Sequence, residues 1–293
     1  MKNIFLYVVS VAIWGSTWIA IKFQLGFVDP LISVFYRYVL AAMILIIFCY
    51  ARGLKMKFSF KEHRYFALLG LFLFSVSYWL VYIAEVYVTS ALLAVTYSSL
   101  VFMNIFNGAL FLKTPIKAQM ITGAFVGIIG ICLIFMPEIK SFDFSDKAFF
   151  GLILSFTSVY IASLGNILSS RNQKAGMPVI QTNAYAMMYG AIILLIIALF
   201  LKKDFTFLFT TSYLISLVYL SVFGSVLAFG SYLTLIGEIG ADRASYAIML
   251  VPVVALGISS LFEGYVWNIQ SVLGLLLVLI GNFMALRKKA DFS

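Results

Sequence analysis

The residues that could perform covalent chemistry are few and scattered in this sequence. The single histidine, His63, stands between Glu62 and Arg64, and the two cysteines, Cys49 and Cys132, each lie inside an apolar run. A metal-assisted or acid–base enzyme needs a cluster of histidine and acidic groups or a pair of carboxylates. Neither pattern occurs, and the cysteine spacing fits no metal site or disulfide pair. The sequence therefore predicts no enzyme, no metal centre and no cofactor.

Aromatic and polar side chains instead recur three, four or seven residues apart inside apolar runs, which places them on common helix faces. Aromatic walls with a few hydrogen-bonding groups are typical of a pocket for an organic molecule. The alternative is that these side chains bridge neighbouring helices or form interfacial belts. Asn104 and Asn107 share a face with Tyr97, as Ser225 does with Tyr232. The residues that we expect to bind a substrate are Trp14, Tyr78, Trp79, Tyr82, Tyr97, Asn166 and Tyr232.

Three further residues could gate or shape such a pocket. Arg37 lies about six residues into an apolar run, where a charge must face protein or water; it could anchor an anionic group, or snorkel to carbonyls near the membrane surface. Pro252 lies near the middle of another run, which predicts a bend that is either a hinge or a static kink. Glu263, like Glu85 and Glu238, falls at the end of a run. No carboxylate is therefore expected at mid-membrane for proton coupling.

The elements that carry these residues are predicted to be membrane-spanning helices. Hydrophobic residues make up 63% of the 293 and charged residues only 11%, whereas a soluble domain is about one quarter charged. Apolar runs of about 20 residues follow one another along the chain. We predict an all-α membrane protein with ten transmembrane helices, at residues 4–23, 31–50, 65–84, 89–112, 117–136, 148–169, 179–200, 212–236, 243–262 and 268–286.

The net charge of +9 could indicate a nucleic-acid partner, but the basic residues lie between apolar runs and not on a face interleaved with aromatics. Lysine and arginine stay on the cytoplasmic side during insertion. With the N-terminus inside, fourteen of the twenty fall in cytoplasmic segments and four in outer loops, namely Lys140, Lys147, Lys202 and Lys203. We expect both termini in the cytoplasm, a location in the cytoplasmic membrane, no nucleic-acid partner and a monomer.

The sequence also repeats itself at an offset of 151 residues, which superposes Gln119 on Gln270, Gly123 on Gly274 and Gly130 on Gly281. Glycines two turns apart on one face allow close helix packing in lipid. Each half has five predicted spans, an odd number, so the second half must enter the membrane in the opposite orientation. We predict a five-plus-five inverted repeat, with repeats at 1–137 and 148–289 and a substrate site where the halves meet.

Several short motifs keep a regular order along the chain, namely Trp14-Gly15-Ser16-Thr17-Trp18, Asp29-Pro30, Tyr36-Arg37-Tyr38 and Leu261-Phe262-Glu263-Gly264. In this order and spacing the chain resembles the EamA-type members of the drug/metabolite transporter superfamily. One departure is Leu112-Lys113-Thr114-Pro115, where that family usually has a Leu-Gly-Glu type ending, so no acidic role carries over to this position. The resemblance implies a ten-helix inverted repeat that moves small organic metabolites by alternating access, often outward.

We therefore expect a secondary transporter that exports or exchanges small organic metabolites across a lipid bilayer. Amino acids, their derivatives, nucleoside-like metabolites and lipophilic cations would all suit an aromatic pocket. The alternatives are a membrane channel, which would have a continuous polar or charged pore, and an intramembrane enzyme.

Overall fold

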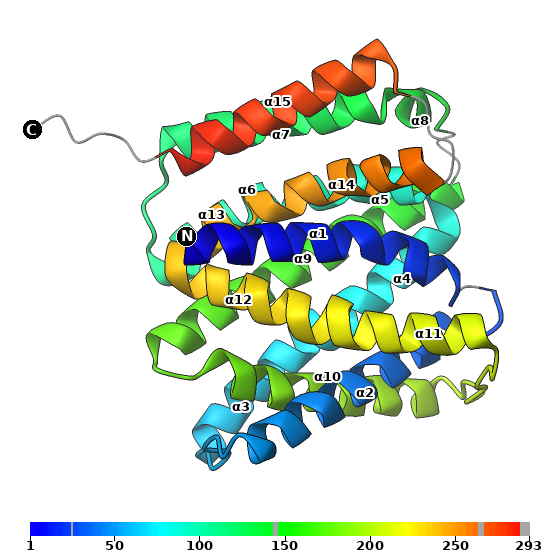
Figure 1. Cartoon of the computed structure of the whole chain (residues 1–293), viewed down its shortest axis with the longest axis vertical. Coiled ribbons are helices and arrows are strands. Elements are labelled where there is room, and N and C mark those ends of the chain that lie inside the picture. The colour runs from blue at the N-terminus through cyan, green and yellow to red at the C-terminus, as the bar shows by residue number, and fades with distance from the viewer. Residues whose placement is uncertain (25, 143–145, 263–266, 288–293) are drawn as a thin grey trace, which may run out of the picture.

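The computed structural model describes residues 1–24, 26–142, 146–262 and 267–287, and every regular element within these ranges is helical. The long helices lie roughly side by side in one bundle (Figure 1). In chain order they are α1 (Lys2–Lys22), α2 (Pro30–Ala51), α3 (Phe60–Leu71), η1 (Phe72–Val76), α4 (Ser77–Tyr87), α5 (Ser90–Ser98), α6 (Leu100–Leu112), α7 (Ala118–Ile134), α8 (Met136–Lys140), α9 (Asp146–Lys174), α10 (Val179–Phe200), α11 (Thr211–Tyr219), η2 (Leu220–Leu227), α12 (Ala228–Ile239), α13 (Ala241–Ala244), α14 (Tyr246–Phe262) and α15 (Ile269–Leu286).

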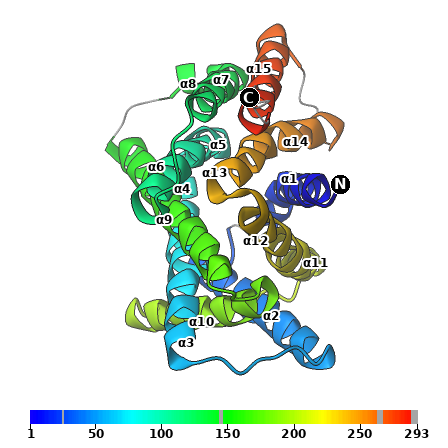
Figure 2. The same cartoon turned by 90° about the vertical axis from the view of Figure 1, so that its left-hand side faces the viewer.

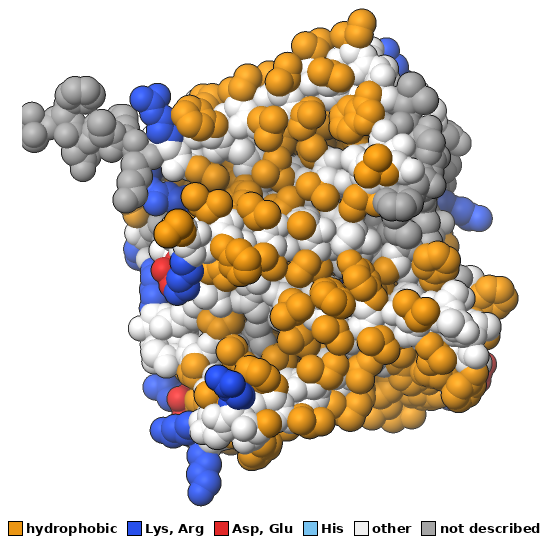
Figure 3. All heavy atoms as spheres, in the orientation of Figure 1, with side chains coloured by type: hydrophobic (Ala, Val, Ile, Leu, Met, Phe, Trp, Pro, Cys, Tyr) orange, Lys and Arg blue, Asp and Glu red, His pale blue; other side chains and the backbone are white. Residues whose placement is uncertain are grey.

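Eight helical stretches of the described chain are long and apolar enough to cross a membrane, and α7 is a shorter apolar helix. The eight stretches coincide with eight of the predicted spans, while α1 and α7 occupy the other two positions. Some ends differ from the prediction, since the stretch predicted at 65–84 begins at Phe60 and the one predicted at 148–169 continues to Lys174. On the face shown in Figure 3, hydrophobic side chains cover the middle, and lysine and arginine gather mostly at the edge where Figure 1 places the N-terminus.

Two segments predicted as single helices are interrupted. The segment predicted at 89–112 divides at Ser99 into α5 and α6, and the segment predicted at 243–262 divides at Ser245 into α13 and α14. In both cases the serine hydroxyl bonds back to a carbonyl three residues earlier, Thr96 O at 2.6 Å and Asp242 O at 2.6 Å. Such local bonds compete with the regular helical ladder. Pro252, in contrast, lies within the continuous helix α14.

Two long stretches contain π-helical turns at corresponding positions. One is η1, between α3 and α4, and the other is η2, between α11 and α12. The offset of 151 residues carries 72–76 onto 223–227, which lies inside η2. In η1 the Ser75 hydroxyl donates to the carbonyls of Gly70 and Leu71, at 3.1 and 2.8 Å. π-Helical turns widen a helix locally and are frequent at functional sites.

The start of α2 illustrates how the sequence sets helix ends. Asp29 is the N-cap, and its carboxylate accepts a hydrogen bond from the Leu31 amide at 2.9 Å, while Pro30 occupies the first turn. Proline suits this position because its missing N–H would have had no partner there. The same carboxylate pairs with Lys203 at 2.8 Å, which links this end of α2 to the segment after α10.

Helices α7 and α15 pack backbone against backbone as a pair at one side of the bundle (Figure 2). A Cβ atom on Gly123 would lie 2.6 Å from the Gly281 carbonyl oxygen, and one on Gly130 would lie 2.5 Å from that of Gly274. The contacts therefore join the first glycine of α7 to the second of α15, and the second to the first. This crossed pairing shows that the two helices run antiparallel.

Helices α9 and α1, one from each half of the chain, each pack mainly against two further helices. Helix α9 packs against α4 and α6, and α1 packs against α12 and α14. The pair α2 and α10 lies on the opposite side of the bundle from α7 and α15 (Figures 1 and 2). Helices α1 and α9 lie between these two outer pairs (Figures 1 and 2).

Candidate functional site

A cavity of about 150 Å³ lies among α1, α2, η1, α4, α5, α6, α9, α12 and α14, and we call it the central cavity. Eight of the residues singled out from the sequence line it, namely Trp14, Arg37, Tyr78, Tyr82, Tyr97, Asn166, Tyr232 and Pro252. They come from helices that are far apart in the chain. The bundle thus brings side chains from both halves of the sequence to one space.

Trp14 of α1 forms an aromatic wall of this cavity. The Trp14 ring meets Phe229 and Tyr232 edge to face, with ring centroids 5.1 and 5.0 Å apart. Its indole N–H donates to the Gly224 carbonyl in η2 at 3.2 Å. Edge-to-face contacts and a satisfied indole hold a buried ring in one orientation. The wall is therefore preorganised to stack on a flat or apolar group.

Arg37 places a positive charge on the cavity lining. It is 1% exposed, and its Nε donates to the Ser225 hydroxyl in η2 at 2.8 Å. The guanidinium carbon lies 5.1 Å from the centroid of the Tyr78 ring, within the range of cation–π attraction. A Cβ atom on Gly224 would come within 3.0 Å of the guanidinium. The side chain thus reaches across to the second half of the chain and does not snorkel toward the surface.

Two sets of hydrogen-bonded polar groups border the cavity. The Asn166 amide donates to the Tyr232 hydroxyl at 3.2 Å and lies 3.5 Å from Asn104 Oδ1. The Tyr97 hydroxyl and the Ser158 hydroxyl are 2.7 Å apart. All of these groups are buried or nearly so, and buried polar groups need such partners. The cavity therefore has an aromatic wall, a cation and several hydrogen-bonding groups.

Two of the predicted site residues are placed differently. Trp79 does not line the central cavity; it packs against the hydrophobic core beside it. At about 100° per residue, Trp79 points about 100° away from Tyr78 and about 60° away from Tyr82 around the helix, so it lies to one side of the cavity-facing pair. This corrects the expectation for Trp79. Glu263 lies outside the described residues.

Phe229 and Glu85 are among the lining residues that the sequence interpretation did not assign to the pocket. Phe229 contacts both Trp14 and Phe74, the latter at a centroid distance of 4.9 Å. It lies four residues after Ser225, on the helix face that the sequence already marked as polar, and that spacing could have revealed it. Glu85 lies at the end of a predicted span, as expected, and also reaches the cavity.

The described residues contain no group of three or more histidine, cysteine or acidic side chains that could hold a metal ion. The side chains that line the central cavity offer stacking, hydrogen bonding and charge attraction.

Comparison with known proteins decides the family. The model of the EamA-like transporter family matches this chain twice, over residues 1–136 and 149–287. The chain belongs to the EamA-like transporter family. It is thus a membrane transporter of the drug/metabolite transporter superfamily and not an enzyme.

This EamA-like transporter is also similar to individual proteins over nearly its whole length. Protein PagO of Salmonella typhimurium is 23% identical over 273 residues, which cover 93% of this chain and 89% of PagO. The uncharacterized transporter YoaV of Bacillus subtilis is 26% identical over 289 residues and is matched over 97% of both chains. A solved crystal structure superposes with a TM-score of 0.81 over 97% of this chain and 96% of its own, at 15% identity. The last similarity shows the fold alone.

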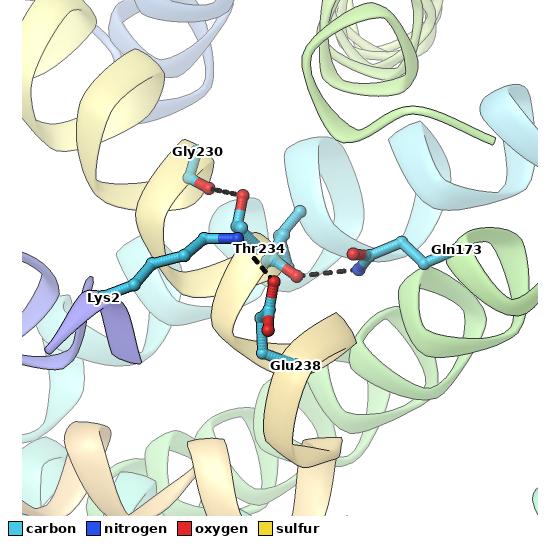
Figure 4. A network of polar contacts seen from close by, with 6 residues as sticks. Lys2, Gln173, Gly230, Thr234 and Glu238 are labelled. Atoms are coloured by element: carbon cyan, nitrogen blue, oxygen red, sulfur yellow. Dashed lines mark hydrogen bonds and ion pairs between the residues drawn. The ribbon is translucent and has the colours of Figure 1, made fainter. Parts of the chain in front are cut away.

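The transporter has a second cavity, of about 250 Å³, near the ends of α6, α9 and α12 where the chain also begins. Its charged lining residues are Lys117, Lys174, Asp242 and Arg243. Beside it, the Gln173 amide donates to the Leu233 carbonyl at 2.7 Å, and Glu238 pairs with Lys2 at 2.6 Å (Figure 4). These contacts tie the end of α12 to α9 and to α1.

Proposed function

We propose that this protein is a secondary transporter that moves small organic metabolites across the cytoplasmic membrane by alternating access, through export or exchange. The observation that carries the proposal is the central cavity, in which Trp14, Arg37 and Asn166 present an aromatic face, a cation and an amide from three different helices. Pockets for small organic molecules combine mostly apolar walls with a few such polar groups. Amino acids and their derivatives have the size and the groups to match.

We further propose ten membrane spans arranged as a five-plus-five inverted repeat, with repeats at 1–137 and 148–289. Three observations support it: the family model matches once in each half, the π-helical turns recur at the same offset, and the glycine contacts of α7 and α15 are crossed. Crossed contacts are what a two-fold axis between equivalent helices produces. In such repeats the substrate site lies where the halves meet, as the central cavity does.

The same proposal places both termini in the cytoplasm. Lysine and arginine gather at the edge that carries the N-terminus (Figure 3), and such residues mark the cytoplasmic side. The transporter is then a monomer in the cytoplasmic membrane that contacts lipid and a small-molecule substrate and has no nucleic-acid partner.

Counterflow in proteoliposomes tests the proposal. Vesicles loaded with one unlabelled metabolite are diluted into a trace of the labelled compound, for a panel of amino acids, amino-acid derivatives, nucleoside-like compounds and lipophilic cations. A carrier accumulates label transiently above equilibrium, because the outward gradient of unlabelled compound drives exchange. The panel is repeated with a proton gradient, and protein-free vesicles are the control.

A channel gives a different result in the same assay. Label would equilibrate through an open pore without overshoot, whatever compound the vesicles contain. Equilibration of this kind, or no protein-dependent uptake of any compound in the panel, would contradict the proposed function.

A further inference from the structure

The two cavities lie end to end along the same helices. The central cavity reaches Asn166 on α9 and Tyr232 on α12. The second cavity begins one residue later on α9, at Ile167, and one turn later on α12, at Ile236. Only a thin layer of side chains therefore separates them.

That layer is polar and buried. Asn104 is 0% exposed, and Asn166 and Tyr232 are each 2% exposed. Asn166 bridges Asn104 and Tyr232, and the Asn104 amide donates to the Ala241 carbonyl at 3.1 Å. We call Asn104, Asn166 and Tyr232 the barrier. It joins α6 of the first half to α9, α12 and α13 of the second.

Hydrogen bonds suit a barrier that must open. Buried amide and hydroxyl groups are costly without partners, yet they can exchange a protein partner for water at little net cost. A barrier of apolar side chains would gain no hydrogen bonds from water when it opened. A layer of this kind can therefore separate two cavities in one state and be hydrated in another.

The second cavity is electropositive. Lys117, Lys174 and Arg243 line it with only one carboxylate, Asp242, and none of the three cations forms an ion pair within the described part of the chain. Clefts lined by one sign of charge attract oppositely charged ligands. The chemistry of this cavity favours a carboxylate or another anionic group.

We propose that the second cavity is a separate binding position on the transport path, that it accepts the anionic group of a substrate, and that the barrier divides it from the central cavity. The proposal rests on the proposed transport function and on the N-terminal side being cytoplasmic. It gives Asn104 a gating role and gives Lys174 and Arg243 a substrate-attracting role.

Cysteine accessibility tests the barrier without knowledge of the substrate. In a background with Cys49→Ala and Cys132→Ala, Ala162→Cys reports on the central cavity and Ser170→Cys on the second cavity. A membrane-impermeant maleimide is applied from the side of the N-terminus. Ser170→Cys should react readily and Ala162→Cys slowly. Removing one barrier hydrogen bond should speed the reaction of Ala162→Cys about tenfold.

Two variants remove barrier bonds in different ways, so that a folding defect in one does not decide the result. Asn104→Ala deletes an amide, and Tyr232→Phe deletes only a hydroxyl. Asn282→Ala removes a buried amide on α15, away from both cavities, and should leave the rate unchanged. Two results would contradict the proposed barrier. One is equal labelling rates at the two reporter cysteines when the barrier residues are unchanged, and the other is no acceleration in either variant.

Charged thiol reagents test the electropositive cavity. At Ser170→Cys, an anionic sulfonate reagent should react about tenfold faster than a cationic trimethylammonium reagent, after correction for their rates with free cysteine. Lys174→Gln and Arg243→Gln should each lower this ratio, and added salt should lower it too. Lys57→Gln, outside the cavity lining, is the control. A corrected ratio of one or less would overturn the anionic preference.

The labelling outcome and the transport outcome are distinguishable. Accessibility is measured without substrate, so a closed barrier together with a failed counterflow panel contradicts the proposed function alone. Active counterflow together with an open barrier contradicts only the inference made here.

Discussion

At the scale of single residues, the position of a side chain around its helix decides its role. Trp14 and Tyr82 line the central cavity, whereas Trp79 packs into the core. We predict that Trp14→Ala and Tyr82→Ala weaken apparent substrate affinity about two- to thirtyfold, because an aromatic contact contributes roughly 0.5–2 kcal/mol. The measurement is the concentration dependence of exchange in proteoliposomes.

Three aromatic residues serve as controls for that experiment. Trp79→Ala removes an indole of the same size outside the lining, and Phe200 and Phe283 are 84% and 66% exposed, on the surface. Their alanine variants should bind like the parent. A loss of affinity in these controls, with normal binding in Trp14→Ala and Tyr82→Ala, would show that the site lies elsewhere.

Glu85 and Glu238 also differ in where their side chains lie. Glu85 reaches the central cavity, while Glu238 pairs with Lys2 at the exposed end of α12. A carboxylate beside a substrate can exchange protons with the transport cycle. From the sequence alone, both were expected at the ends of spans and not in a central proton relay. With the cavity in view, we predict that Glu85→Gln slows exchange by about tenfold, or about 1.4 kcal/mol, and flattens its pH dependence.

Exchange rates measured across a pH series check this prediction, with Glu238→Gln as the matched variant that keeps the parent profile. An unchanged exchange rate and an unchanged pH profile in Glu85→Gln would mean that Glu85 has only a structural role.

Phe229 shows the limit of sequence reasoning at this scale. A phenylalanine inside an apolar run has no chemical contrast with its neighbours, so only its spacing from Ser225, and not its polarity, could have singled it out. Tyrosine and asparagine stand out because lipid cannot satisfy them, and for this reason Tyr97, Asn166 and Tyr232 could be placed on cavity-facing sides in advance.

At the scale of elements, the contact of α7 and α15 depends on the absence of side chains. A Cβ atom on Gly130 would lie 2.5 Å from a carbonyl oxygen, whereas Gly230, in α12, has nothing within 4 Å of the same atom. We predict that Gly130→Ala destabilises the protein by about 1–3 kcal/mol through overpacking, and that Gly230→Ala does not. Thermal unfolding in detergent measures both variants. Equal melting temperatures would mean that α7 and α15 can separate without cost.

Helices could be predicted because long apolar runs have few other solutions in a bilayer. The interruptions of these helices could not be predicted. The π-helical turns and the breaks at Ser99 and Ser245 arise from where a side-chain hydroxyl finds a carbonyl and from how neighbouring helices pack, and no local pattern in the sequence encodes either.

At the scale of the whole molecule, orientation follows from charge. We predict that reporter fusions after Lys57, Lys174 and Arg287 lie in the cytoplasm and that fusions at Lys140 and Lys203 lie outside, because lysine and arginine are retained on the cytoplasmic side. Paired reporters, each active on only one side of the membrane, make the measurement. Cytoplasmic signals at both Lys140 and Lys203 would contradict the ten-span arrangement.

The crossed glycine contacts have a consequence for the origin of the chain. Gly123 meets Gly281 and Gly130 meets Gly274, so each half offers the other the same two glycines in the same order. A contact of this type is self-complementary. A half-length ancestor inserted into the membrane in both orientations could have formed it with a second copy of itself. Fusion of two such copies would then have preserved an old dimer interface as an internal one.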